Sequence, residues 1–121
     1  MKITFVKVEV LLPEEYIETL RNRLNDIGIL TIGKYDHVIS YSYVKGSWRP
    51  LEGAIPFNGT TGEICFGTEC KMEFRCLYEK IEEVLRIIKS IHPYEEPVIN
   101  VLPLLFRVKH YKIYKSKCEA T

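Results

Sequence analysis

The chain contains 121 residues, of which 46% are hydrophobic and 27% are charged, and its formal net charge is +1 at pH 7. These values are ordinary for a single globular domain with one core, and no apolar run approaches the ~20 residues that a membrane-spanning helix needs. Residues 1–8 alternate like a strand and lack the apolar block of a signal peptide, so we expect a cytoplasmic protein without a membrane partner.

The first half of the chain predicts a strand, a helix and a second strand. Residues 2–11 alternate, and one face carries Thr4, Val6, Val8 and Val10. Pro13 suits the first turn of a helix, which we expect to end at Gly28. The apolar stripe of this helix consists of Ile17, Leu20, Leu24 and Ile27. The second strand is expected in two pieces around Gly33, and its later part places on one face Tyr35, His37, Ile39, Tyr41 and Tyr43.

The second half repeats this order after a long loop over residues 45–68, which holds five of the seven glycines. Loops of such length in a compact domain are usually functional or disordered. Residues 71–77 alternate as a strand, residues 78–91 carry an apolar helical stripe, and residues 98–106 form the last predicted strand. The order, βαβ followed by βαβ, predicts an α+β domain with ferredoxin-like topology.

The last predicted strand also indicates self-association, because residues 98–106 are apolar on both faces. The helices can cover only one face of such a sheet. The other face would be apolar and uncovered, which is typical of an association site. We therefore expect the chain to form a homo-oligomer through its open sheet face.

The four cysteines do not indicate a disulfide framework or a zinc site. Cys65 and Cys70 are five residues apart, a spacing that zinc ligands do not use, and no second pair completes a site. Cys76 lies on the apolar side of a predicted strand, which favours a packing role. Cys118 lies in a polar C-terminal segment. We therefore expect no redox function and no cofactor.

The segment His92–Pro97 (HPYEEP) places an imidazole, a phenol and two carboxylates between two prolines. The prolines fix φ and favour an extended residue before each of them, so the segment predicts a stiff bend between a helix and a strand. His92 with Glu95 or Glu96 could hold zinc or copper, which accept mixed histidine and carboxylate ligands. The same groups could instead bind another ligand, or satisfy backbone groups and pair with an arginine of another subunit.

A second candidate site lies in the glycine-rich loop. Arg49 could bind an anion, and Trp48 could stack on a ligand ring. The glycines allow the backbone to approach a ligand closely. Their spacing is neither that of a Walker-type nor that of a Rossmann-type nucleotide site. The loop could equally pack against a neighbouring subunit.

His37 follows Asp36 on a predicted strand, where sequence neighbours point to opposite faces, so we do not expect a catalytic dyad. The candidate ligand-binding residues are His37, Trp48, Arg49, Glu52, His92, Tyr94, Glu95 and Glu96.

These motifs resemble those of a known family. HPYEEP before a strand that ends in Leu-Pro-Leu, the turn of residues 33–37 (GKYDH) and the loop of residues 49–59 (RPLEGAIPFNG) resemble the insert domain of Nif-three-like proteins and its stand-alone YqfO-type relatives. CutA, the divalent-cation tolerance protein, has a similar bend. The resemblance covers roughly residues 1–105 and implies a ferredoxin-like fold of the PII/CutA type, usually a homotrimer. It does not imply a defined activity.

We expect residues 1–106 to form this domain and residues 107–121 to form a basic C-terminal extension. The extension could contact an acidic partner, or could be a charged strand that resists edge pairing. We do not expect nucleic acid as a partner. We also expect no catalysis, because no nucleophile has a base at a recognisable spacing and nothing resembles the metal-binding domain of full-length Nif-three-like proteins.

The hypothesis drawn from the sequence is a non-catalytic, trimeric module that binds a small anion or nucleotide or acts as a regulator. Two alternatives stay open. One is a CutA-like protein that binds a divalent metal through His92, Glu95 and Glu96. The other is a protein-interaction module that acts through the basic extension.

Overall fold

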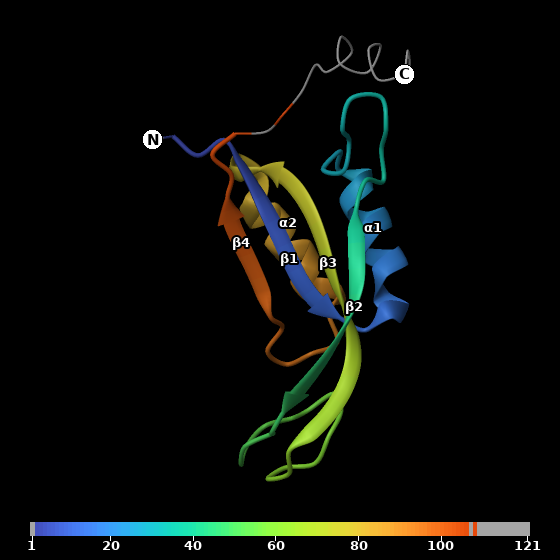
Figure 1. The fold of residues 1–121 in the computed structure, drawn as a ribbon, viewed down its shortest axis with the longest axis vertical. Coiled ribbons are helices and arrows are strands. Elements are labelled where there is room, and N and C mark those ends of the chain that lie inside the picture. The colour runs from blue at the N-terminus through green and yellow to red at the C-terminus, as the bar shows by residue number, and fades with distance from the viewer. Residues whose placement is uncertain (1, 107, 109–121) are drawn as a thin grey trace, which may run out of the picture.

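The computed structural model describes residues 2–106 and Val108, and its elements follow the predicted order (Figure 1). The elements are β1 (Phe5–Leu12), the 3₁₀ turn η1 (Glu14–Tyr16), α1 (Ile17–Asp26), β2 (Ser40–Trp48), β3 (Cys65–Leu77), the 3₁₀ turn η2 (Tyr78–Lys80), α2 (Ile81–Ile91) and β4 (Ile99–Pro103). In this part of the chain the strands form one antiparallel sheet in the order β2-β3-β1-β4. Both helices cover the same face of it, so the predicted ferredoxin-like α+β fold is confirmed.

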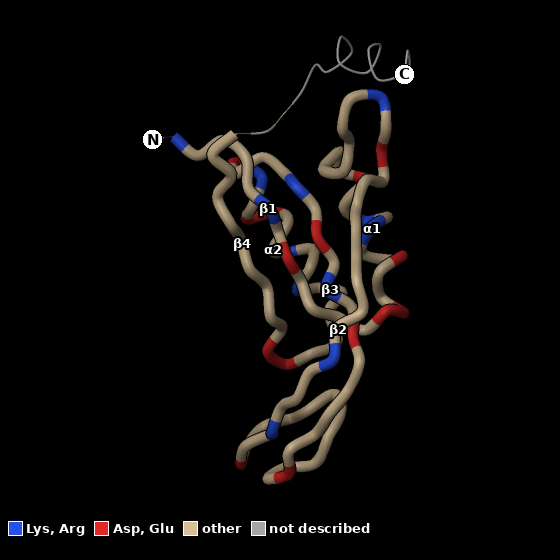
Figure 2. Tube along the Cα trace, viewed as in Figure 1, with Lys and Arg blue, Asp and Glu red and all other residues tan. Residues whose placement is uncertain are grey.

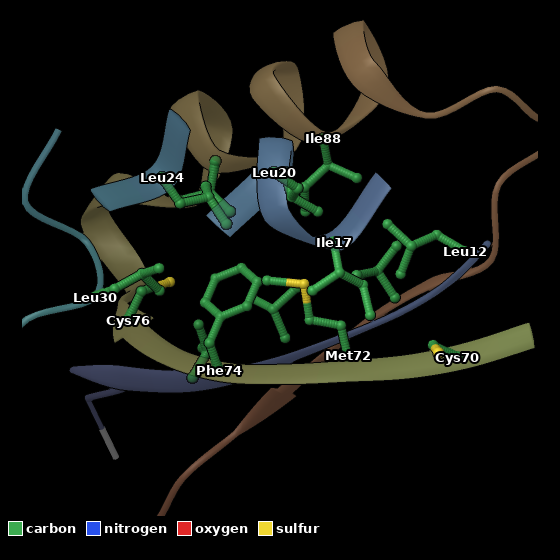
Figure 3. Close-up of a cluster of buried hydrophobic side chains, with 14 residues drawn as sticks. Leu12, Ile17, Leu20, Leu24, Leu30, Cys70, Met72, Phe74, Cys76 and Ile88 are labelled. Atoms are coloured by element: carbon green, nitrogen blue, oxygen red, sulfur yellow. The ribbon is translucent and has the colours of Figure 1, made fainter. Parts of the chain in front are cut away.

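The core lies between this face of the sheet and the two helices (Figure 3). In β1, Val8 and Val10 are fully buried, and their partners across the antiparallel pair, Phe74 and Met72 of β3, are buried on the same face. Burying one such side chain contributes roughly 1.5–3 kcal/mol, so this cluster is what holds the helices on the sheet. The alternation that predicted β1 and the second half of β3 therefore identified the core face correctly.

The helical stripe predicted for residues 17–27 is correct except at its end. Its three earlier members are buried, but Ile27 is 37% exposed because α1 has already ended at Asp26. Gly28 then takes a left-handed φ of 76°, which turns the chain back toward the sheet. Leu30 follows this turn and fills the core in place of Ile27.

The strands β2 and β3 are longer than the sequence predicts and form a two-stranded arm that reaches beyond the helices (Figure 1). The predicted loop over residues 45–68 is therefore wrong in its bounds, because the pairing continues to Trp48 opposite Cys65. The loop itself spans residues 49–64. Past the helix layer no helix of the described chain covers the helix-side face of the arm, so Phe66 is 78% exposed.

The uncovered face of the sheet is charged at its centre, so the prediction that this face is apolar is wrong there, while association through it stays a prediction. Lys7 Nζ lies 3.1 Å from a Glu9 carboxylate oxygen and 3.5 Å from one of Glu73, and Lys71 Nζ lies 3.4 Å from Glu73. Figure 2 shows charged residues of both signs along β1 and β3. The last strand ends at Pro103 and contributes Leu102 to this face, opposite Lys7.

Cys65, Cys70 and Cys76 are free thiols. Cys70 and Cys76 are buried in the core, and burial raises the pKa of the Cys76 thiol to about 11. A thiol with so high a pKa stays protonated at neutral pH and packs as a small apolar side chain. The packing role predicted for Cys76 is therefore confirmed.

None of the helices in residues 2–106 is long and apolar enough to cross a membrane. The basic extension predicted over residues 107–121 lies, apart from Val108, outside the described residues, and so does Cys118. The domain boundary predicted at residue 106 accordingly stays a prediction.

Candidate functional site

The HPYEEP segment starts where α2 ends, and His92 ties it to the sheet. His92 is buried, its Nε2 contacts the carbonyl oxygen of Leu11 at the end of β1, and its Nδ1 accepts a hydrogen bond of 3.2 Å from the Tyr94 backbone N–H. A carbonyl only accepts, so Nε2 carries the proton and the imidazole is neutral. Burial lowers the pKa of His92, and the bond to Leu11 opposes this shift. The histidine therefore fixes the bend to β1.

The loop of residues 49–64 packs against this bend, although 40 residues separate the contacting groups. The Ile55 backbone N–H donates to Glu95 Oε1 at 3.0 Å. The rings of Phe57 and Tyr94 pack with their centroids 5.8 Å apart, and Tyr94 in turn lies 4.7 Å from the His92 ring. The structure thus brings the two motifs predicted as candidate sites together within one chain. We call this contact region the loop–bend junction.

The loop is also fixed internally, and Trp48 does most of this. Trp48 Nε1 donates to the Asn58 carbonyl oxygen at 3.0 Å, and its ring covers Gly67, where an added Cβ would lie 3.1 Å from the ring. Gly62 N–H closes the loop by donating to the Pro50 carbonyl oxygen at 2.8 Å. Trp48, which was predicted to stack on a ligand ring, therefore has a structural role, because its N–H and part of its ring make contacts within the loop and the arm.

Arg49, Glu52 and Glu96 remain at the surface of this region. The Arg49 side chain is exposed and makes no ion pair with any residue of the described part of the chain. Glu52 lies in a turn that the Ala54 N–H closes on the Leu51 carbonyl oxygen. An exposed guanidinium with no internal acceptor keeps all of its N–H donors for an anion.

Glu69 is the member of this region that the sequence interpretation missed. Its Oε1 atom is buried with no hydrogen-bond partner among the described residues, and burial raises the pKa of the carboxyl group. Burial also raises the pKa of Tyr94, with a further contribution from the charge of Glu69. The alternation of β3 places Glu69 on the same face as Lys71, and nothing in the local sequence shows that this position lies next to the bend.

The predicted surroundings of His37 are wrong, and the segment between α1 and β2 that contains it lies at the end of the molecule opposite the arm (Figure 1). Residue 37 is not on a strand with the tyrosines: it takes a positive φ of 57°, and its backbone N–H donates to Asn25 Oδ1 at 2.8 Å. This turn lets the ring meet its sequence neighbour, so His37 Nδ1 lies 2.8 Å from Asp36 Oδ1. The bond to His37 lowers the pKa of Asp36. Both side chains are exposed, which favours a turn-stabilising role.

The candidate metal ligands do not assemble. Within residues 2–106 and Val108, no three histidine, cysteine, aspartate or glutamate side chains come together where they could hold a metal ion. Both ring nitrogens of His92 face backbone groups, and Glu95 accepts from Ile55. A metal at His92 would first have to break the bond between the bend and β1.

The contact at Glu95 gives a first testable prediction. Replacing Glu95 with Ala removes the acceptor for the Ile55 N–H, which costs roughly 1 kcal/mol of local stability. Hydrogen exchange at the Ile55 amide is therefore expected to accelerate by about fivefold to tenfold, while exchange in the core strands stays unchanged. Glu96→Ala serves as the matched control, since the exposed Glu96 side chain makes no described hydrogen bond. Equal exchange rates in the two variants would contradict the docking role of Glu95.

Comparisons with known proteins find similar sequences and folds. The family model described as CutA1 divalent ion tolerance protein matches residues 60–117. A curated Bacillus subtilis protein named GTP cyclohydrolase 1 type 2 homolog is 35% identical over 98 residues, which cover 81% of this chain and 26% of that protein. The chain therefore spans about a quarter of the length of such relatives.

Solved structures support the same relationship. A Bacillus cereus protein related to NIF3 superposes with a TM-score of 0.73 and 29% identity, over 86% of this chain and 26% of that one. CutA from Archaeoglobus fulgidus superposes with a TM-score of 0.67 and 19% identity, over 93% and 96% of the two chains. Arabidopsis thaliana PII bound to citrate gives 0.58 and 23%, over 88% and 82%. The predicted PII/CutA-type fold and the resemblance to Nif-three-like proteins are confirmed.

Proposed function

We propose, on the premise of this relationship to NIF3-related and CutA/PII proteins, that the chain is a non-catalytic ligand-binding or regulatory module that binds a small anion or nucleotide. The observation that carries the proposal is the loop–bend junction. It holds the loop of residues 49–64 in one position, while the Arg49 guanidinium, where the loop begins, has no counter-ion among the residues that the structure describes.

The chemistry of this region favours an anion. Arg49 can offer a carboxylate or phosphate two parallel N–H donors, and a loop fixed in advance loses little entropy when a ligand binds. In this proposal Trp48 orients the loop, and Glu52 is an acid that a ligand must avoid or bridge. The PII neighbour bound to citrate and the GTP in the name of the curated relatives supply two probes of suitable chemistry.

The proposal includes a homotrimer, which the resemblance implies. The described chain leaves apolar side chains exposed on the arm and its loop, on β4 and beyond β4, which favours association through those surfaces: Ile64, Phe66, Val101, Leu105 and Phe106. Sedimentation equilibrium tests this directly, with three times the chain mass of 14.2 kDa as the expected result. A mass of one chain at micromolar concentration would remove the trimer from the proposal.

The test of ligand binding is thermal unfolding of the full chain with citrate, GTP and inorganic phosphate at low ionic strength. A ligand at 100 times its Kd adds about 2.7 kcal/mol to the free energy of unfolding, so the Tm should rise clearly for at least one probe. Arg49→Gln should weaken that probe by tenfold or more, and added salt should weaken it in the wild-type chain. Arg86→Gln, at an exposed position of α2, is the matched control.

Two results would count against the proposal. One is a Tm that none of the three probes changes. The other is a ligand-induced Tm shift that is the same in the wild-type chain and in Arg49→Gln, since binding would then not depend on the loop. Zinc and copper belong in the same panel, and a shift with either metal that His92→Gln abolishes would favour the CutA-like alternative.

A further inference from the structure

We propose that the peptide group between Asn58 and Gly59, in the loop of residues 49–64, is a site of spontaneous covalent modification at which Asn58 loses its side-chain amide and becomes an acid. This modification does not depend on the proposed function. Asn58 is the only one of the four asparagines of the chain that a glycine follows. Asparagine is one of the chemically labile residues, and a glycine after it leaves the neighbouring backbone nitrogen unshielded by a side chain.

The loop requires glycine at position 59 and leaves both reacting groups unbonded. Gly59 has a φ of 106°, and an added Cβ would lie 2.8 Å from Cys65 Sγ, so a larger residue would be strained there. The Asn58 side chain is exposed and makes no hydrogen bond with the residues that the structure describes. The Gly59 N–H likewise has no acceptor among these residues. The reaction therefore breaks no hydrogen bond of either group.

The reaction needs only water as a co-reactant. The Gly59 backbone nitrogen gives up its proton to a solvent base and attacks the side-chain carbonyl carbon of Asn58, so that a new nitrogen–carbon bond closes a cyclic imide. The bond to the side-chain nitrogen breaks, and this nitrogen takes up a proton and leaves as ammonia. Water then adds to one of the imide carbonyls and opens the ring, which leaves either aspartate or isoaspartate at position 58. The reacting groups belong to adjacent residues, so no association step is needed.

Trp48 is positioned to promote the first step. Its Nε1–H donates a hydrogen bond of 3.0 Å to the Asn58 carbonyl oxygen, and this oxygen belongs to the same peptide group as the attacking nitrogen. When the nitrogen loses its proton, resonance places much of the negative charge on that oxygen. A donor that already points at the atom where charge develops stabilises this charge without reorganisation. The fold therefore supplies at Asn58 an element of catalysis that an unfolded chain lacks.

The products change the loop in two ways. Either acid adds a negative charge, which lowers the formal net charge of the chain from +1 to 0 at pH 7. Isoaspartate also inserts a methylene into the main chain, which moves the carbonyl oxygen that Trp48 contacts. A consequence for ligand binding rests on the proposed function: the new carboxylate would compete with an anion for Arg49 of the same loop. The modification would then switch this site off with time.

The test incubates the full wild-type chain at neutral and at mildly alkaline pH, and follows it by ion-exchange chromatography and by peptide mapping with mass spectrometry. An acidic species is expected to accumulate, with the amide of Asn58 lost before that of any other asparagine. The conversion should be faster at alkaline pH, because the nucleophile is the deprotonated nitrogen. Trp48→Phe keeps an aromatic ring but lacks the N–H, so it should convert at least tenfold more slowly. Asn58→Gln should stay unmodified, because its longer side chain would have to close a larger ring.

Three results would overturn the proposal. One is that the amide of Asn58 survives in the folded chain as well as those of the other asparagines. Another is conversion that is as fast or faster in Trp48→Phe, since the loop would then protect Asn58. The third is equally fast conversion of the wild-type chain unfolded in urea, which keeps the sequence but not the contact with Trp48. Circular dichroism checks that both variants are folded.

Anion binding is measured on the same samples, so that this proposal and the proposed function fail separately. Whichever of citrate, GTP and inorganic phosphate raises the Tm of the fresh chain should raise that of the aged, modified chain less. A fresh chain that none of the three stabilises would contradict the proposed function, while the mass spectra would still decide whether Asn58 is modified.

Discussion

The His92→Ala variant is expected to be about 2–4 kcal/mol less stable than the wild-type chain. Two buried or half-buried groups lose their partner at once, the Leu11 carbonyl oxygen and the Tyr94 N–H, and the ring that Tyr94 packs on disappears. Urea unfolding followed by circular dichroism measures the loss. His37→Ala is the matched control and should cost far less, because the His37 side chain is exposed and lies in the turn between α1 and β2.

The same residue predicts how stability depends on pH. Burial holds the pKa of His92 in the fold below its ordinary value of 6.5. The unfolded chain therefore takes up a proton at a pH where the folded chain does not, and stability falls as the pH drops below about 6.5. Above that pH both states are neutral and the contribution is fully present. In His92→Ala this part of the acid destabilisation should be missing, and an unchanged slope would refute the neutral, buried assignment.

The fold could be predicted wherever the chain contacts the core. The alternation of β1 and of residues 71–77 reports a sheet with one buried face, and the stripe of α1 reports a helix on top of it. The arm could not be predicted in this way. Residues 44–48 and 65–69 pair beyond the core, so neither face of this part of the arm is buried and its residues carry no consistent pattern. Glycines are typical of loops, so the glycines in these residues led to the prediction of a loop.

The candidate site was predictable in its location and not in its contacts. The density of polar groups between Pro93 and Pro97 marked the bend, because a simple turn needs none of them. The partner of Glu95 is 40 residues away, and the conformation of His37 depends on Asn25, which lies 12 residues earlier. Local patterns do not report such pairs. The open face shows the same limit, since apolar residues near residues 98–106 gave no information on the charges of β1 and β3.

Replacing Gly59 with Ala is expected to detach the loop from the arm. Gly59 has a φ of 106°, which a residue with a side chain adopts only with strain. An added Cβ would also lie 2.8 Å from Cys65 Sγ and 2.9 Å from Trp48 Nε1, closer than such atoms approach. Strain and overpacking together cost about 2–4 kcal/mol, more than the local hydrogen bonds of the loop provide.

Trp48 is the only tryptophan of the chain, so its fluorescence reports this change directly. In Gly59→Ala the emission should shift to longer wavelength as the indole loses its bond to the Asn58 carbonyl oxygen and enters water. The far-ultraviolet circular dichroism should change little, because the helices and the core strands lie outside the arm and keep their structure. Gly46→Ala is the matched control on the same arm: its φ is not positive and nothing lies within 4 Å of an added Cβ. A red shift in both variants, or in neither, would mean that Gly59 does not position the loop, and the fixed Arg49 of the proposed site would lose its support.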